Sequence, residues 1–189
     1  MLPAHRLRPT LLVLSILGAG PAHAFSLGAP ICEVQALPLA PMSPTLASPA
    51  PAGWQLRIDT PRYIPGQPLR VAVTNTDPTQ RARGVLLWAK SGPVTGFGSF
   101  VVDNALWQHL PGSANCGEWA ITHTSNAAKP LDQLRFDWIA PDAASTNVLF
   151  RAFVIEDCDD PTGCRSYQAL TPVTVVQAGL FFDDFEPGG

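Results

Sequence analysis

Hydrophobic and polar positions alternate with a period of two in several short stretches of this chain. In the central stretch, Trp119 and Ile121 alternate with polar or small residues, and Leu134, Phe136 and Trp138 do the same after a polar turn. This period is typical of half-buried antiparallel strands, because successive side chains of a strand point to opposite faces. We therefore predict two strands at the centre of a β-sandwich, with Trp119 and Trp138 facing the same side.

Further stretches read as strands and are separated by turn residues. Residues 84–90 form a continuous apolar run, which suits a strand covered on both faces, and residues 148–155 form the most strand-like run of the chain. The remaining strands are predicted at residues 54–58, 69–74, 97–102 and 173–176. About eight strands at short spacing predict an all-β fold, an immunoglobulin-like antiparallel β-sandwich. The connection that carries Trp107 and His109 is expected to be a loop.

The amino-acid composition agrees with this fold and argues against nucleic acid and anionic lipid as partners. The 20 prolines and 15 glycines argue against long helices, and a hydrophobic content of 46% permits a core. The net charge is −3, and without the first 24 residues, which contain Arg6 and Arg8, it becomes 10 − 15 = −5. A mildly acidic surface gives no electrostatic basis for binding nucleic acid or anionic lipid. We expect neither as a partner.

The N-terminus has the pattern of a secretory signal peptide. A basic segment is followed by the apolar run at residues 11–17 and by Ala22-His23-Ala24, an A-x-A cleavage signature. We predict a signal peptide over residues 1–24 and a secreted or periplasmic mature chain, with an N-terminal anchor as the alternative. The apolar run is shorter than the roughly 20 residues that span a bilayer, and no later stretch is long enough.

The mature chain divides into three predicted parts. Residues 25–53 are rich in proline and alanine and are expected to form an extended arm. Residues 54–178 carry the strands of the sandwich. Residues 179–189 mix aromatic and acidic side chains, and a loose end, a docking peptide and a sorting signal all remain open for this tail.

Four cysteines lie after the leader, at Cys32, Cys116, Cys158 and Cys164. An even count in an exported chain predicts two disulfides, for which three pairings are possible. Cys158 and Cys164 flank a segment of turn residues, which favours a bond between them and leaves Cys32 with Cys116. That second bond would staple the arm to the centre of the fold. A zinc site is the alternative, but Cys32 and Cys116 lack close C-x-x-C partners, so no metal site is assigned.

Two features are candidates for ligand binding. Glu156, Asp157, Asp159 and Asp160 cluster around a cysteine, and an oxygen-rich loop of this kind can hold calcium. The spacing is not that of an EF-hand, and a solvated acidic loop is the commoner outcome. Trp107 is the best candidate for an exposed, sugar-stacking tryptophan, because the other four tryptophans fall in predicted strands.

The sequence gives little basis for catalysis. Only His109 and His123 remain after the leader, so Ser–His and metal chemistry have few candidates. His123 ends a predicted strand among threonines, where a hydrogen bond to Thr122, to Thr124 or to a backbone carbonyl is the simpler role. No Gly-x-Ser-x-Gly nucleophile elbow is present. We expect no catalytic residues and no cofactor.

Taken in order, these features resemble the reelin (reeler) domain over roughly residues 25–176. The matching segments are Gly28-Ala29-Pro30 before Cys32, the Pro/Ser-rich residues 41–44, Tyr63-Ile64-Pro65-Gly66, Arg83-Gly84-Val85-Leu86-Leu87-Trp88-Ala89, Gly98-Ser99-Phe100, Cys116, Ile121-Thr122-His123-Thr124, Phe136-Asp137-Trp138-Ile139-Ala140-Pro141 and Val148-Leu149-Phe150-Arg151-Ala152. The resemblance implies an immunoglobulin-like sandwich, a secreted context and disulfide pairings that agree with those favoured above. The chain departs from the family after Val154, where the short Cys158–Cys164 loop replaces a Tyr/Trp-bearing stretch.

The resemblance adds a function class but no catalytic residues to transfer. We expect a secreted, non-catalytic binding or adhesion module that recognises an extracellular protein or polysaccharide of the matrix or cell surface. A secreted defence-type effector against microbial cells is the second hypothesis. A hydrolase is the third, and the shortage of histidines weighs against it.

Overall fold

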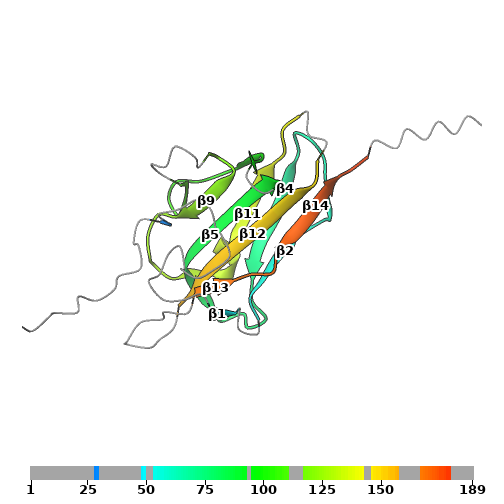
Figure 1. Cartoon of the computed structure of the whole chain (residues 1–189). Coiled ribbons are helices and arrows are strands. Elements are labelled where there is room, and N and C mark those ends of the chain that lie inside the picture. Colours follow the sequence, from blue (N-terminus) through cyan, green and yellow to red (C-terminus); the bar gives the residue numbers. More distant parts are fainter. Residues whose placement is uncertain are drawn as a thin grey trace, which may run out of the picture.

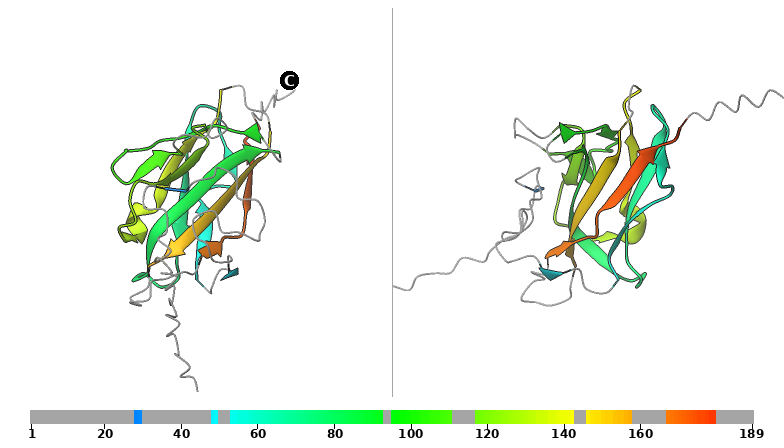
Figure 2. Two further views of the ribbon diagram at one scale, coloured as in Figure 1. Left: turned by 60° about the vertical axis from the view of Figure 1, so that its left-hand side comes forward. Right: turned by 45° about the vertical axis from the view of Figure 1, so that its right-hand side comes forward.

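The computed structural model describes residues 28–29, 48–49, 53–92, 95–110, 117–142, 146–157 and 167–179. These residues form strands, with one short 3-10 turn, η1, at Leu131–Gln133. Figures 1 and 2 show the strands as two layers packed face to face, with β5, β9 and β12 in one layer and β2, β4 and β11 in the other. The predicted all-β sandwich is confirmed.

The larger layer is a ten-stranded sheet built around one long antiparallel pair. Its path runs through β1 (Ser48–Pro49), β13 (Tyr167–Ala169), β12 (Val148–Glu156), β5 (Arg81–Ser91), β9 (Ala120–His123) and β8 (Trp107–His109). Four short strands join off this path, namely β3 (Arg62–Tyr63), β6 (Thr95–Gly96), β10 (Lys129–Pro130) and β14 (Val173–Gln177). Strands β5 and β12 are the apolar runs of the sequence, and both are covered on their two faces, as continuous apolar strands require.

The smaller layer has four strands in the order β2 (Gln55–Ile58), β4 (Pro68–Thr74), β11 (Arg135–Ile139) and β7 (Ser99–Phe100). Buried and exposed residues alternate along β4, as the period-two pattern predicts. Its inner face packs on the larger sheet, and its outer face is open. The structure has more strands than the eight or so that the sequence predicted, because several of them are only two residues long and too short to show a period of two.

Trp138 lies at the centre of the core between the two sheets. Its side chain is fully buried, and its indole N–H donates to the carbonyl oxygen of Phe97 at 3.0 Å. Edge-to-face contacts join it to Tyr63, at a centroid distance of 5.7 Å, and to Phe150, at 5.1 Å. This packing is the one that aromatic quadrupoles favour.

Trp119 does not share this core, so the prediction that it faces the same side as Trp138 is wrong. It packs against a second hydrophobic cluster that contains Leu86, Trp88 and Phe153. The alternation fails because β9 begins only at Ala120, after a turn closed by the hydrogen bond from Ala120 N–H to Gly117 O. Trp119 therefore belongs to the turn, and its orientation is independent of the strand period.

Two fragments of the predicted arm are described. Ala29 is buried, and its N–H donates to the hydroxyl oxygen of Thr122 at 2.9 Å. Ser48–Pro49 pair in parallel with β13. At these two places the arm lies along the sandwich. In the described part of the chain, no helix is long and apolar enough to cross a membrane.

Candidate functional site

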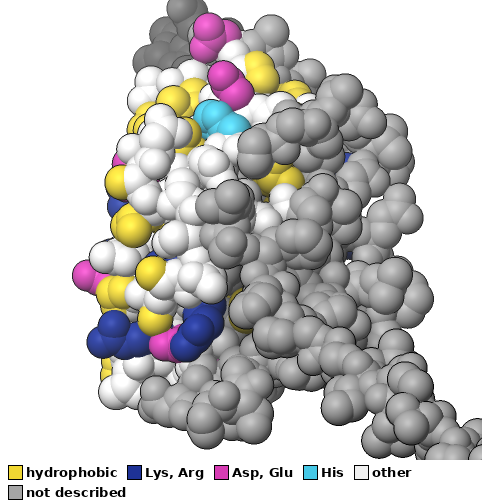
Figure 3. Space-filling view, turned by 90° about the vertical axis from the view of Figure 1, so that its left-hand side faces the viewer, with side chains coloured by type: hydrophobic (Ala, Val, Ile, Leu, Met, Phe, Trp, Pro, Cys, Tyr) yellow, Lys and Arg dark blue, Asp and Glu magenta, His cyan; other side chains and the backbone are white. Residues whose placement is uncertain are grey.

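Charged side chains are sparse on the surface that the structure describes. On the side shown in Figure 3, uncharged side chains cover most of the described area, and the Lys and Arg side chains gather near its lower edge beside an acidic one. The whole chain has a net charge of −3. No continuous basic stripe crosses the described part of this side, so it offers no track for a polyanion.

The start of β5 and the end of β12 bring Arg83, Lys129, Glu156 and Asp157 to one corner of the larger sheet, which we call the β5–β12 corner. Arg83 Nε donates to Asp157 Oδ1, and the Asp157 side chain is only 15% exposed. Glu156 accepts a hydrogen bond from the Gln168 amide at 3.2 Å. Both described acids of the predicted cluster are therefore engaged by donors of the chain itself.

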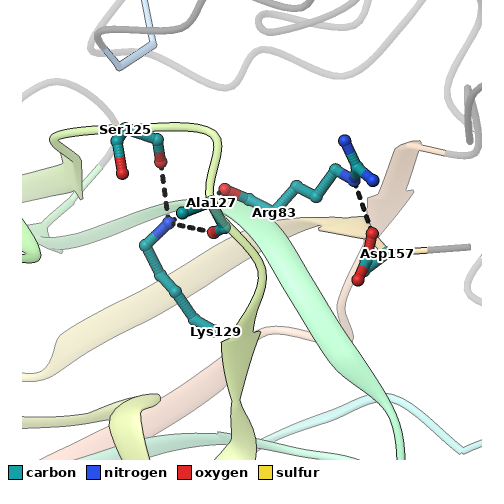
Figure 4. Close-up of polar contacts among 5 residues, drawn as sticks. All are labelled: Arg83, Ser125, Ala127, Lys129 and Asp157. Carbon is teal, nitrogen blue, oxygen red and sulfur yellow. Dashed lines mark hydrogen bonds and ion pairs between the residues drawn. The ribbon is translucent and has the colours of Figure 1, made fainter.

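Lys129 fixes the same corner from inside. Its side chain is 1% exposed, and the ammonium donates to the carbonyl oxygens of Ser125 at 2.7 Å, Ala127 at 2.8 Å and Arg83 at 3.1 Å (Figure 4). These three bonds use all three donors of a lysine ammonium. Burial lowers the pKa of Lys129 to about 8. The lysine ties the turn at residues 125–127 to β5, the strand whose Arg83 pairs with Asp157.

Part of the predicted acidic cluster and all four cysteines are not described by the structure. Asp159 and Asp160, and the four cysteines with their predicted pairings, lie outside the described residues. Among the residues that are described, no three His, Cys, Asp or Glu side chains come together in a way that could hold a metal ion.

The expectation that Trp107 is an exposed loop residue is wrong. It begins strand β8 and is only 5% exposed, its indole N–H donates to Gln133 O at 3.1 Å, and its ring packs on Phe136 at a centroid distance of 4.8 Å. The cause is local. The Asp103 carboxylate accepts the N–H groups of Ala105 and Leu106, each at 3.1 Å, which closes a turn and delivers the chain into β8. The hydrogen bond from Leu106 N–H, with smaller ones from its neighbours, lowers the pKa of Asp103.

Both histidines make hydrogen bonds within the sandwich. His109 Nε2 lies 2.9 Å from Phe100 O. His123 is 1% exposed, and its Nδ1 lies 3.3 Å from the Thr122 hydroxyl and 3.4 Å from Val85 O. The predicted hydrogen bonding of His123 is confirmed. Its ring also fills the space above Gly84, where an added Cβ would stand 2.7 Å from it.

A surface that the sequence analysis missed lies on the open face of the smaller sheet. A shallow hollow of about 520 Å³ is lined by residues of β2, β4 and β11, including Arg57, Ala72 and Arg135. We call it the arginine hollow. Register places Ala72 of β4 directly between Arg57 of β2 and Arg135 of β11. The two arginines occupy polar positions in strands with a period-two pattern, so the sequence predicted that each faces solvent. Only the order of the strands shows that they lie near each other.

The chain was compared with known proteins. A family model described as the reeler domain matches residues 38–160, more than half of the chain. A curated relative from Hyphantria cunea, named "Putative defense protein Hdd11", is 30% identical over 139 residues, which cover 70% of this chain and 79% of the relative.

Solved structures agree in fold. The human F-spondin reeler domain is 18% identical, with a TM-score of 0.53 and coverage of 70% of this chain and 95% of that domain. A second structure, of the Reelin-N domain of F-spondin, is 20% identical, with a TM-score of 0.54 and coverage of 70% and 91%. From the match of the family model and the relative, we conclude that the chain belongs to the reeler domain family.

Proposed function

We propose that this chain is a secreted, non-catalytic binding module that recognises an extracellular matrix or cell-surface component. Membership of the reeler domain family and the sandwich fold support a module of this kind. The leader-like residues 1–24 support export. The engagement of both histidines with backbone carbonyls supports a role without general acid–base catalysis.

The observation that carries this proposal is the internal bracing of the β5–β12 corner. Lys129 satisfies three carbonyl groups under the turn at residues 125–127, and Arg83 holds Asp157 against the sheet. Loops that are held by the scaffold lose little conformational entropy on binding, which favours recognition. A braced loop end supports a recognition role, and catalysis would instead need a base or nucleophile placed to act there.

A defence role is the second candidate, favoured by one observation. The curated relative from Hyphantria cunea carries the word defense in its name, and 79% of its length is covered. A defence protein that acts by attaching to microbial surfaces would use the same kind of loop platform. The two candidates differ in consequence, because only an effector inhibits growth.

We predict saturable binding of the purified chain to at least one extracellular component in a screen of matrix proteins, polysaccharides and whole microbial cells. Replacement of His109 by glutamine should leave that binding unchanged, because the side chain is engaged with the backbone carbonyl of Phe100. Plate binding and a growth assay with the same preparation measure both outcomes.

EDTA tests the acidic cluster as a calcium site, and a reductant tests the predicted disulfides.

The screen separates the hypotheses. Binding without growth inhibition supports the module, and growth inhibition transfers support to the effector. Absence of binding to every component, with a cooperative thermal transition that shows a folded chain, would contradict the proposed function.

A further inference from the structure

We propose that the arginine hollow is a binding site for a single aspartate or glutamate carboxylate of a polypeptide partner, clamped between Arg57 and Arg135 over Ala72. The inference rests on the proposed function and deepens it, since it names the chemistry by which a binding module would hold its partner. It concerns the open face of the smaller sheet, away from the loops of the β5–β12 corner.

Two rows of side chains cross this face. In one row the Asp59 N–H donates to Arg70 O, which sets these residues opposite each other, and Arg70 pairs with Asp137 of β11. Arg70 Nε and Nη2 donate to the two oxygens of Asp137 at 2.7 and 3.3 Å. This row contains two carboxylates and one guanidinium, and its guanidinium is already paired with Asp137.

The neighbouring row carries only positive charges. It reads Arg57, Ala72, Arg135 across β2, β4 and β11, with two positive charges and no carboxylate. Arg57 Nε and Nη2 donate to the Gln55 amide oxygen at 3.1 and 2.8 Å, which steadies the group and leaves three of its five N–H donors unused. The structure gives the exposed Arg135 guanidinium no hydrogen bond or ion pair with any described residue.

Ala72 makes room for a ligand between the two guanidiniums. Adjacent strands lie about 4.8 Å apart, so Arg57 and Arg135 start roughly 10 Å from each other, within reach of one small anion. The position between them holds only a methyl group, and the hollow there has a volume of about 520 Å³. A carboxylate above Ala72 would complete this row in the way that Asp137 completes the row of Arg70, by charge-assisted hydrogen bonds from planar guanidiniums.

The charge balance selects the class of partner. With Arg57, Arg70 and Arg135 against Asp59 and Asp137, the face carries 3 − 2 = +1. The rest of the chain is acidic. A polyanion with a charge on every repeat would meet Asp59 and Asp137 beside the clamp. A polypeptide can instead present one aspartate or glutamate among neutral amides, which matches a site of +1 edged by threonines.

The test uses a carboxylate built into the protein. Ala72→Glu places a carboxylate between the two arginines, where directly opposed cross-strand side chains are in contact range. Ala72→Gln is the matched neutral control, and an Arg57→Gln, Arg135→Gln double variant removes the clamp. All changes lie on the open face, so the melting temperature should show that each variant folds.

The probes are the capped peptides Gly-Glu-Gly and Gly-Gln-Gly and a sulfated hexasaccharide, and the readout is the ¹⁵N-detected Nε–H resonances of Arg57 and Arg135. We expect the glutamyl peptide to shift both resonances saturably and the glutaminyl peptide to leave them unchanged. Ala72→Glu should reproduce the shifted positions without peptide and weaken peptide binding at least tenfold, whereas Ala72→Gln should do neither. The double variant lacks both reporter resonances, so its peptide binding is followed by the backbone amide resonance of Ala72, and it should also be weaker by at least tenfold.

Two results with the peptide and saccharide probes would overturn the clamp. One is equal shifts with the glutamyl and glutaminyl peptides, and the other is a response to the sulfated hexasaccharide without a response to the glutamyl peptide. Failure of the clamp can be distinguished from failure of the proposed function. An extracellular component that binds the double variant as tightly as the parent keeps that function and removes the clamp. A peptide response without any extracellular component bound keeps the clamp and removes the function.

Discussion

Replacement of Trp138 by alanine is expected to lower the free energy of unfolding by about 3–5 kcal/mol, the range for removing a large aromatic side chain from a core. Trp138 is completely buried and contacts Tyr63 and Phe150 edge to face across the two sheets. Its loss would also leave Phe97 O without the indole donor. Denaturation by urea, followed by far-ultraviolet circular dichroism, measures the change.

Trp138→Phe is the matched control for this substitution. It keeps an aromatic ring in the space between the sheets and removes the indole N–H, so the loss of stability should be clearly smaller than that of the alanine variant. A further control is Val176→Ala, which truncates a side chain that is 40% exposed and should change stability little. A loss below about 1 kcal/mol for Trp138→Ala would contradict the central role given to this residue.

The sequence predicted the strands that keep one face toward the core and the other toward solvent along their whole length. Strand β11 shows this clearly, because Phe136 and Trp138 are buried in one core and the residues that alternate with them are less buried. Trp119 and Trp107 show the limit. Trp119 stands in a turn one residue before its strand, and Trp107 enters a strand only because the Asp103 carboxylate shapes the preceding turn. Periodicity carries no information about either event, since both depend on hydrogen bonds made outside the strand.

Sites assembled across strands are harder to predict than the strands themselves. The acidic cluster was recognisable because its members are close in sequence, but the engagement of Asp157 by Arg83 depends on a contact between residues 74 positions apart. Arg57 and Arg135 become neighbours only through the order β2, β4, β11. Lys129 is the plainest case. A lysine in a polar turn is ordinarily exposed, and its burial follows from three carbonyl groups that converge in the folded chain.

Replacement of Lys129 by methionine is expected to lower the free energy of unfolding at pH 7 by about 2 kcal/mol. Three carbonyl oxygens would lose their donor, and each buried polar group left unsatisfied costs about 1–3 kcal/mol. The loss is partly offset because methionine fills the space of the lysine stem without a charge to desolvate. The carbonyl groups of Ser125 and Ala127 belong to a turn, so hydrogen exchange should show faster opening at residues 124–128 than elsewhere. Unchanged exchange in this turn would contradict the bracing role.

The pH dependence of stability tests whether the pKa of Lys129 is lowered in the folded chain. Burial lowers the pKa of Lys129 from 10.5 to about 8 in the folded chain, so between these values the unfolded chain binds more protons than the folded one. The free energy of unfolding contributed by Lys129 should therefore rise with pH through this window, by up to about 3 kcal/mol, and be flat below about pH 8. The difference in stability between the parent and Lys129→Met isolates this contribution from other titrating groups, and it should widen from pH 7 to pH 10. A difference that stays constant would mean that the three carbonyl groups hold the ammonium charged and that the pKa of Lys129 is not lowered.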